Sequence, residues 1–238
     1  MLRNRPAMSA HAVELSLLCC ANLLLLALPG WNTSKSDDEE TIQNSSTVLK
    51  AMVDAKTVPE DLLARANCIV VLPGVKKAGF LIGGSGGRGA MSCRSGKEFT
   101  GRWSAPAIYT IGGASFGLQA GGSSTDFVLL VMSKKGVNAV LQGKTKFGND
   151  ATVAAGPTGA TTSGTVGGSD ILTYGRAKGL FAGMSLGGAT LSADNDANKR
   201  LYNKPVNPKE IVLENAVQPT AAGREMISLC DGVTARTK

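Results

Sequence analysis

The sequence predicts an α+β domain in which a glycine-rich curved antiparallel sheet, or a small β-barrel, is flanked by N- and C-terminal helices. Of the 30 glycines in the 238 residues, 27 fall between residues 64 and 191, among short apolar runs bounded by turn signals. The sequences on either side instead place apolar residues at helical spacing. Hydrophobic residues make up 43% of the chain, which is enough to fill a core, and the glycines lack the three-residue period of collagen.

Residues 1–30 have the features of a secretory signal peptide or an N-terminal anchor. Two arginines precede an apolar run over 15–28, which is shorter than the about 20 residues that a transmembrane helix needs. The segment 27–29 matches a small-x-small cleavage site poorly, so an uncleaved anchor stays open, as does initiation at Met8. The acidic sequence that follows predicts a solvated linker over 31–40. We therefore expect an exported protein that is periplasmic, secreted or membrane-associated.

The sequences that flank the glycine-rich middle predict helices. Residues 41–56 carry apolar side chains on one face at helical spacing. Pro59, followed by two acidic residues, suits the start of a second helix. Asn207, with proline next and glutamate three residues on, has the signature of a capping box. A last helix is expected over about 219–232.

The middle of the chain predicts strands. Its apolar runs are interrupted or flanked by glycine, which inside a strand often marks a bulge, tight curvature or the close approach of a backbone. The first run ends at Pro73-Gly74, a turn signal. The glycine-rich strands recur at no fixed interval, so a solenoid or propeller is not expected. The expected strands are 68–72, 80–82, 107–111, 127–132 and 180–191.

The cysteine and histidine content argues against most catalytic chemistry. The only histidine, His11, lies in the segment expected to be removed, so the mature protein would lack an imidazole for nucleophile activation or metal binding. Cys68, Cys93 and Cys230 would remain, and their spacing does not decide whether two of them form a disulfide. Cys68 lies in an apolar run and is expected to be a small buried hydrophobe. No cofactor and no metal is expected.

Several glycine motifs match catalytic or nucleotide-binding signatures without their context. Gly-x-Ser-x-Gly occurs three times, but no base is available to activate the serine. The match of residues 84–89 to the dinucleotide fingerprint is not followed by a helical pattern and predicts a hairpin. Residues 143–145 resemble the end of a P-loop but lack its first glycine. An enzyme is therefore not expected. The spacing of the carboxylates in the middle segment does not indicate a catalytic pair. These residues are Glu98, Asp126, Asp150 and Asp170.

The glycine-rich middle is strongly basic. Residues 64–191 hold 13 Lys and Arg against 4 Asp and Glu. Basic side chains among exposed backbone N–H groups suit an anionic partner, and few aromatic residues argue against nucleic acid. Anionic lipid headgroups are therefore the favoured polyanion. Trp103 is expected in the core. The expected headgroup contacts, which should converge on one exposed face of the sheet, are Lys76, Lys77, Arg102, Arg176 and Lys178.

Seven segments in a fixed order resemble the SYLF domain family. The most specific are Trp103-Ser104-Ala105-Pro106 and the segment Tyr174–Gly183, and the resemblance extends over about 42–232. The other five are Lys76–Phe80, Gly86–Gly89, Phe116–Gly121, Asp126–Leu130 and Ala154–Pro157. The resemblance implies a lipid-binding module that recognises phosphoinositides or other anionic phospholipids, with actin binding in some yeast members and export in bacterial ones. Ala160 departs from the pattern, since relatives often carry a basic residue there.

These observations predict one lipid-binding domain over 41–232 with a short tail over 233–238. Its expected function is non-catalytic binding of anionic phospholipid at a membrane surface. The alternatives are an envelope structural or protein-interaction module that binds an acidic protein or polysaccharide, and a carrier that holds an apolar ligand inside a barrel. Nucleic acid is not expected as a partner, and neither is actin if the protein is an exported bacterial member.

Overall fold

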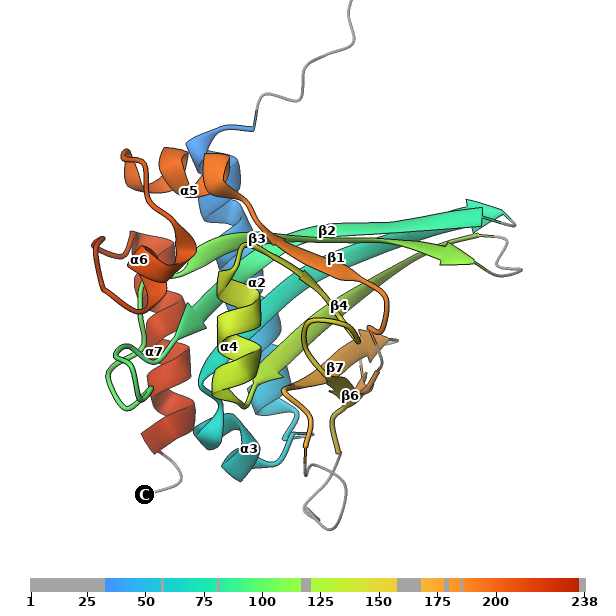
Figure 1. The fold of residues 1–238 in the computed structure, drawn as a ribbon, viewed down its shortest axis with the longest axis horizontal. Coiled ribbons are helices and arrows are strands. Elements are labelled where there is room, and N and C mark those ends of the chain that lie inside the picture. Colours follow the sequence, from blue (N-terminus) through green and yellow to red (C-terminus); the bar gives the residue numbers. More distant parts are fainter. Residues whose placement is uncertain are drawn as a thin grey trace, which may run out of the picture. The chain divides into compact units, whose positions relative to one another are not determined.

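The computed structural model describes residues 33–56, 58–80, 82–116, 121–157, 168–177, 180–184 and 186–235 (Figure 1). Within this part of the chain one sheet runs in the order β5-β9-β3-β2-β1-β4-β7-β6, with β8 paired to β7. The strands are β1 (Cys68–Phe80), β2 (Ile82–Cys93), β3 (Ala107–Phe116), β4 (Gly121–Val131), β5 (Lys144–Lys146), β6 (Val153–Ala155), β7 (Ile171–Ala177), β8 (Leu180–Gly183) and β9 (Thr190–Ala193). The helices are α2 (Lys35–Asp54), α3 (Glu60–Arg65), α4 (Lys134–Leu141), α5 (Asn195–Tyr202), α6 (Pro208–Val212) and α7 (Ala221–Ala235).

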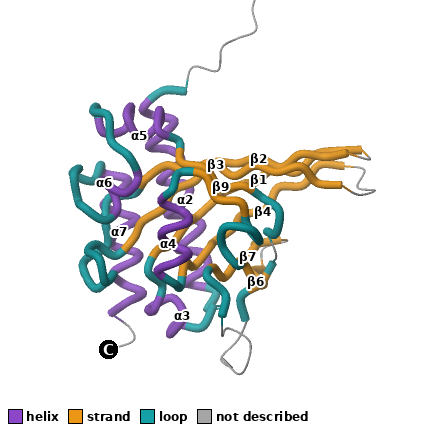
Figure 2. Tube along the Cα trace, viewed as in Figure 1, coloured by secondary structure: helices purple, strands orange, loops and turns teal. Residues whose placement is uncertain are grey.

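The sheet confirms the predicted α+β class. Every strand pair is antiparallel except β6 with β7, and helices from both ends of the chain pack on the sheet. The helices cover one end of the long central strands, as Figure 2 shows. The expected strand 80–82 is instead the point where β1 ends and β2 begins. The expected strand 180–191 is two separate strands, β8 and β9.

Each face of the sheet carries its own hydrophobic core because successive strand residues point to opposite faces. On the α4-side face, large buried side chains including Tyr109, Phe127 and Phe147 pack in one core with residues of α4 and α6. On the α2-side face, buried residues of α2, α3, α5 and α7 pack on the strands, with Leu49 and Met226 fully buried. The filled α4-side core counts against a barrel interior that carries an apolar ligand.

β1 does not end at the predicted turn but continues through it as a bulge. The pairing register of β1 with β4 shifts between Leu72 and Val75. Gly74 adopts a φ of +56°, and its N–H donates to Asp126 Oδ1 at 2.8 Å. On the other side of the bulge a Cβ at Gly89 would lie 1.9 Å from the Val71 carbonyl oxygen. Glycine is therefore required where the bent strand approaches its neighbour.

The acidic segment expected to be a solvated linker is helical in its described part. Ser34 caps α2, accepting a hydrogen bond from the backbone N–H of Asp37, whose carboxylate accepts one from the Ser34 N–H. Asp38 in the first turn is fully buried. The predicted linker is therefore wrong from Lys35 onward, because a buried ionic contact holds this turn. Residues 1–30 lie outside the described part of the chain.

Other predicted boundaries are close to those of the structure. The capping box at Asn207 is present at the start of α6, and α7 ends at Ala235 where the prediction ended at 232. Residues 84–89 lie within β2, as an extended strand and not the opening of a helix. Among the described residues no helix combines the length and apolar character needed to cross a membrane.

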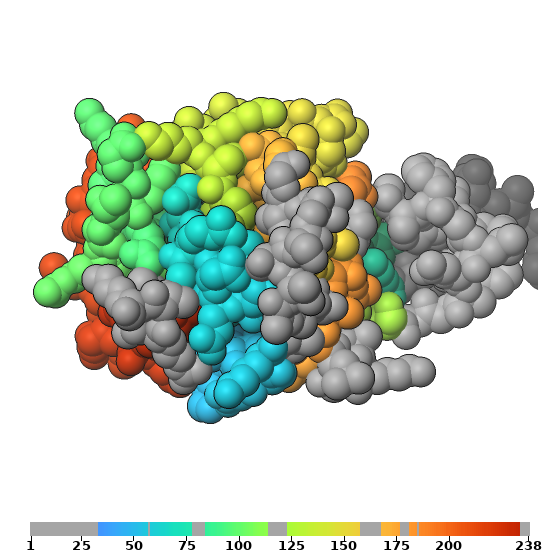
Figure 3. All heavy atoms as spheres, turned by 90° about the horizontal axis from the view of Figure 1, so that it is seen from below, coloured from blue at the N-terminus to red at the C-terminus, as the bar shows by residue number. Residues whose placement is uncertain are grey.

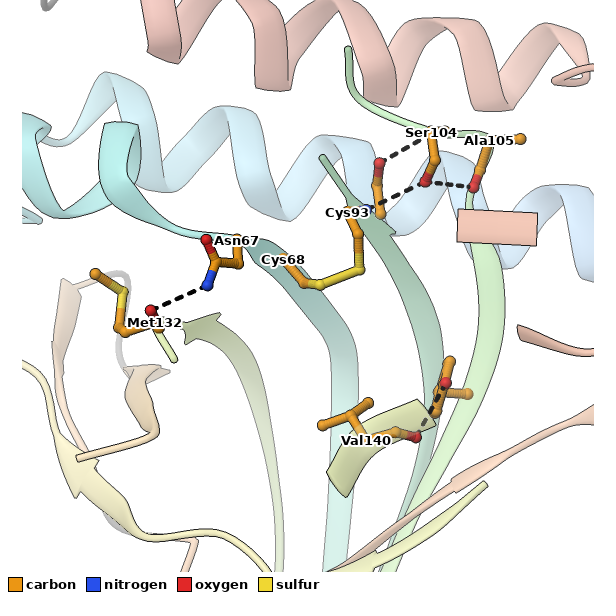
Figure 4. Close-up of a disulfide and its surroundings, with 9 residues drawn as sticks. Asn67, Cys68, Cys93, Ser104, Ala105, Met132 and Val140 are labelled. Atoms are coloured by element: carbon orange, nitrogen blue, oxygen red, sulfur yellow. Dashed lines mark hydrogen bonds between the residues drawn. A yellow bond between two sulfur atoms is a disulfide. The ribbon is translucent and has the colours of Figure 1, made fainter. Parts of the chain in front are cut away.

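Cys68 and Cys93 form a disulfide between directly opposed residues of β1 and β2 (Figure 4). Their Cα atoms are 4.0 Å apart. Cys68 is therefore buried, as expected, but as half of a crosslink that spacing alone did not reveal. Beside it, the Ser104 hydroxyl accepts a hydrogen bond from the Cys93 N–H at 3.2 Å and fixes the end of β2. Cys230 is fully buried on α7, and this burial raises the pKa of its thiol.

Candidate functional site

Four strands extend beyond the helices and form a projecting arm, in the order β3-β2-β1-β4 (Figures 1 and 2). Among the described strands, β3 beyond Gly112 pairs only with β2, and β4 before Asp126 pairs only with β1. We define the arm as residues 75–80, 82–87, 111–116 and 121–125. Arm residues on both faces, such as Gly86 and Ser123, are exposed. At its base Val75, Ile111 and Thr125 are buried, and beyond them the arm residues whose exposure the structure describes are exposed or half-buried.

The arm is built mainly from small residues. Its four segments consist largely of glycine, serine and alanine. Glycine in a strand contributes no side chain to packing and loses more conformational entropy on folding than other residues. A sheet of this kind allows another surface to approach the backbone closely.

Lys76 and Lys77 lie on the arm but on opposite faces of it. Lys76 is opposite Ser124 and is exposed, whereas Lys77 is opposite Ser123 and is half-buried. The Lys77 ammonium lies 5.9 Å from the centroid of the Phe127 ring. Among the described residues neither lysine forms an ion pair with a carboxylate. Both ammonium groups are therefore positive charges that no carboxylate of the described residues compensates.

Arg176 lies at the base of the arm and is neutralised. It stands opposite Asp126 in the β4–β7 register, and its guanidinium forms an ion pair with that carboxylate at 2.5 Å. The guanidinium also lies 5.5 Å from the centroid of the Phe181 ring. Arg176 thus stabilises the junction of β4 and β7, and its charge is already matched by a carboxylate.

Arg102 lies far from the arm. It is exposed in the loop after β2, where its carbonyl accepts a hydrogen bond from the Ser95 N–H. Figure 3 shows this loop in green beside the C-terminal region in red. The loop follows Cys93, the end of β2 that is farthest from the β1–β2 turn. The neighbouring Trp103 is buried in the α2-side core, as expected, with the Arg94 guanidinium 5.3 Å from the centroid of its ring.

The expected convergence of the basic residues on one face is therefore wrong. Adjacent residues of an extended strand point to opposite faces, which separates Lys76 from Lys77. Arg102 lies at the other end of the β1–β2 hairpin, and Arg176 is paired with a carboxylate. Lys178 lies outside the described residues. Whether these side chains contact lipid stays a prediction.

The structure places a different lysine on the same face as Lys76. Lys146 of β5 is opposite Thr190, which is opposite Gly112, then Gly86, then Lys76, in one row across five strands. Four strand spacings separate the two lysines by about 19 Å along the sheet. Both are exposed. The alternation of lysine, buried threonine and lysine in β5 is the sequence signal that could have indicated this face.

A buried ion cluster joins α2 to the sheet and to α5. The Asp38 carboxylate, fully buried, accepts hydrogen bonds from Arg88 at 2.6 Å and from Arg200 at 3.0 Å. Arg88 also contacts Asp194, the N-cap residue of α5. The hydrogen bond with Asp38 raises the pKa of Arg200 further above its usual value. Since each carboxylate here is paired with a guanidinium, the cluster fits a structural role.

The four carboxylates of the glycine-rich middle each hold local structure. Asp126 pairs with Arg176, and Asp150 accepts the Lys146 N–H at 2.6 Å. Exposed Glu98 pairs with a lysine of α4, and Asp170 accepts hydrogen bonds from Ser133 and Thr152. In the described part of the chain no group of three or more histidine, cysteine or acidic residues could hold a metal ion.

Comparison with known proteins decides the family. A family model described as "Ysc84: Las17-binding protein actin regulator" matches residues 112–233, about half of the chain. The chain belongs to the Ysc84 family. This confirms the resemblance to the SYLF domain, which is the same family, and the match includes β4, β7, α6 and most of α7.

The Ysc84 family relatives are eukaryotic proteins that are longer than this chain. An SH3 domain-containing protein of Schizosaccharomyces pombe, PJ696.02, is 33% identical over 204 residues, which are 80% of this chain and 46% of the relative. The SH3 domain-containing YSC84-like protein 1 of Xenopus laevis is 33% identical over 184 residues (75% and 53%). Protein YSC84 of Saccharomyces cerevisiae is 34% identical over 173 residues (70% and 36%).

This chain thus spans about half the length, or less, of these Ysc84 relatives. None of the three names describes an enzyme, and the family description refers to binding and regulation. The expectation of a bacterial member finds no support among these relatives, because all three organisms are eukaryotes.

Proposed function

We propose that this Ysc84-family chain binds anionic phospholipid at a membrane surface without catalysing a reaction. The observation that carries the proposal is the arm, which presents positive charge and no negative charge. Residues 75–87 and 111–125 contain two lysines and neither aspartate nor glutamate. With Lys76 exposed and not neutralised by any described carboxylate, the arm carries uncompensated charge away from the helices.

The electrostatic contribution of the arm is large enough to measure. Each basic residue near an anionic membrane contributes about 1 kcal/mol, so Lys76 and Lys77 together supply roughly 2 kcal/mol, or about thirty-fold in affinity. Lys146, in the same row as Lys76, extends the positive face toward β5. The finer part of the proposal is a preference for phosphoinositide headgroups, whose clustered phosphates attract lysine ammonium groups more strongly than a single phosphate.

Vesicle sedimentation tests the proposal. The chain is mixed with phosphatidylcholine vesicles and with vesicles that also contain phosphatidylserine or, at matched surface charge, a phosphoinositide. Binding should rise with the anionic fraction and fall with salt. A Lys76→Gln/Lys77→Gln variant should bind anionic vesicles about thirty-fold more weakly. The control variant, Lys97→Gln/Lys209→Gln, changes two exposed lysines away from the arm and should bind like the wild type. Equal binding to neutral and anionic vesicles would refute the proposal.

A protein partner is the second candidate. The description of the family names Las17 binding and actin regulation. The outer edges of β3 and β4 in the arm pair with no other described strand, so an extended peptide could add to either edge. The partner would be acidic, to match the lysines. Loss of vesicle binding in the lysine variant supports lipid, whereas unchanged vesicle binding with loss of a captured acidic protein supports this candidate.

We also propose that the protein is exported, which would require the N-terminal 30 residues to act as a signal or an anchor. The Cys68–Cys93 disulfide supports this, because disulfides persist mainly in oxidising compartments. Mass spectrometry of the protein from its native source, with and without reduction before alkylation, tests the proposal. We expect two thiols that are alkylated only after reduction. A mature chain with both thiols reduced would contradict export.

A further inference from the structure

Two lysines of β5 point to the α2-side face of the sheet. Thr145 between them is buried, and its hydroxyl donates a hydrogen bond to the Ala139 carbonyl oxygen of α4 at 2.7 Å. Because successive side chains of a strand point to opposite faces, Lys144 and Lys146 point away from α4. Both lysines are exposed, and they lie about 7 Å apart along the strand.

Lys76 of β1 points to the same face as the β5 lysines. The preceding residue, Val75, is buried in the α4-side core, so Lys76 points to the α2 side. Lys76 is in one row with Lys146, about 19 Å away across the intervening strands. We define the basic shelf as the surface formed by Lys76, Gly86, Gly112, Lys144, Lys146 and Thr190.

The part of the basic shelf between the lysines is open and consists of small residues. Gly86 is exposed, and Gly112 and Thr190 are half-buried. Glycine has no side chain, so an anionic group can approach the backbone closely there. The hydroxyl of Thr190 is a further hydrogen-bond donor for a phosphate oxygen. The surface between the lysines therefore suits phosphate groups.

The carboxylates in the row next to the basic shelf are paired with arginines. Arg88, two residues after Gly86 in β2, contacts Asp38 at 2.6 Å and Asp194 at 3.1 Å. Asp126 forms its ion pair with Arg176 at 2.5 Å. These arginines therefore neutralise the negative charge that borders the shelf.

The lysines of the basic shelf themselves form no ion pair with a carboxylate of the described residues. Asp150 lies beside β5, but its carboxylate accepts the backbone N–H of Lys146 at 2.6 Å. The three ammonium groups thus give the shelf a positive charge that its described neighbours do not compensate.

We propose that an anionic membrane docks on the basic shelf, where Lys76 and the two β5 lysines meet the phosphate groups of separate lipids. This inference rests on the proposed lipid binding and assigns the face that meets the bilayer. The about 19 Å between Lys76 and Lys146 is more than one headgroup spans. Binding therefore depends on the density of anionic lipid in the membrane.

A second copy of the chain is a less suitable occupant of the basic shelf. Two shelves packed face to face would bring the lysines of both copies together. Like charges placed in contact are unfavourable, whereas an anionic bilayer neutralises them. Charge therefore favours lipid over self-association.

The first test compares lysine pairs on opposite faces of the sheet. Lys144→Gln/Lys146→Gln removes two charges from the basic shelf and should weaken binding to phosphatidylcholine–phosphatidylserine vesicles about thirty-fold. The control, Lys134→Gln/Lys135→Gln, removes two exposed charges from α4 on the other face and should weaken binding less than about threefold. Equal losses would show that only net charge matters and would overturn the proposal, as would an unchanged affinity of the shelf variant.

The second test varies the phosphatidylserine fraction of the vesicles at constant total lipid. The affinity of the wild type should rise more steeply than in proportion to this fraction, because several headgroups are bound together. The rise should be shallower in Lys144→Gln/Lys146→Gln. A proportional rise in the wild type would exclude contacts with separate headgroups.

The third test needs no substitution and measures which lysines the membrane covers. Acetylation of each lysine in the wild-type chain is followed by mass spectrometry with and without anionic vesicles. Lys76, Lys144 and Lys146 should be protected several-fold, whereas Lys97 and Lys209, exposed elsewhere, should react at an unchanged rate. If vesicles bind but the shelf lysines are not protected, the docking face is wrong and the proposed function stands. If vesicles do not bind, both fail.

Discussion

Asp126 on β4 and Arg176 on β7 form an ion pair of 2.5 Å at the base of the arm. The same carboxylate accepts the N–H of Gly74, the residue with positive φ in the bulge of β1, at 2.8 Å. One aspartate thus links three neighbouring strands where the sheet leaves its helical cover. The contact ties the base of the arm to the body of the sheet.

Asp126→Ala should lower the free energy of unfolding by about 2 kcal/mol. It removes a charge-assisted hydrogen bond to a half-buried guanidinium and leaves the Gly74 N–H without its acceptor. Urea unfolding measures the change. The matched control is Asp54→Ala, which removes the exposed ion pair with Lys50 and should cost less than about 0.5 kcal/mol. If the two substitutions lowered the unfolding free energy equally, the Asp126 contact would stabilise the protein no more than an exposed ion pair does.

Asp38→Ala should destabilise the protein more strongly, by about 3–5 kcal/mol. The substitution leaves the Arg88 and Arg200 guanidinium groups facing a buried site without their shared carboxylate. Hydrogen exchange should accelerate most in the first turns of α2, since this cluster fixes that end of the helix. Glu40→Ala, at an exposed position in the same turn, should change stability by less than about 0.5 kcal/mol. Uniform loss of protection across the whole sheet would contradict a local role for Asp38.

The features that local sequence determines were predicted well. The capping box at Asn207 needs only residues three apart, and it is present. The burial of Asp38 depends on Arg88 and Arg200, which are 50 and 162 residues away, so composition alone indicated a linker. Pro73-Gly74 is compatible with both a turn and a bulge, and only pairing with β4 decides between them.

The expected convergence of the basic residues on one face failed for a reason that the sequence itself contains. Lys76 and Lys77 are consecutive residues of an extended run, so they could not share a face. The neutralisation of Arg176 by Asp126 was not visible, because the pairing of β4 with β7 brings together residues 50 positions apart. The excess of basic residues over 64–191 located the basic part of the chain. It did not show which of these basic side chains form ion pairs with a carboxylate.

Acid should destabilise the protein in part through Asp170. Burial alone would raise the pKa of this carboxyl, but hydrogen bonds from Ser133 and Thr152 outweigh it and hold the pKa below the ordinary value of 3.8. A depressed folded-state pKa stabilises the protein fully above the ordinary value. The contribution is lost as the pH falls below 3.8 toward the folded pKa. In Asp170→Asn the dependence of the unfolding free energy on pH should be shallower in that range, and an unchanged slope would exclude Asp170 as its source.

Gly89→Ala tests whether the bulge forces β1 against β2. The new Cβ would lie 1.9 Å from the Val71 carbonyl oxygen and 2.8 Å from the Leu72 Cα, and both are backbone atoms that cannot rotate away. We expect a loss of about 3 kcal/mol in the free energy of unfolding, at the upper end for an overpacked site. Gly232→Ala is the control, because nothing lies within 4 Å of its added Cβ and its position on α7 favours alanine by up to about 1 kcal/mol. Opposite signs for the two substitutions would confirm the close approach, whereas a neutral Gly89→Ala would mean that β1 is not held against β2 at this bend.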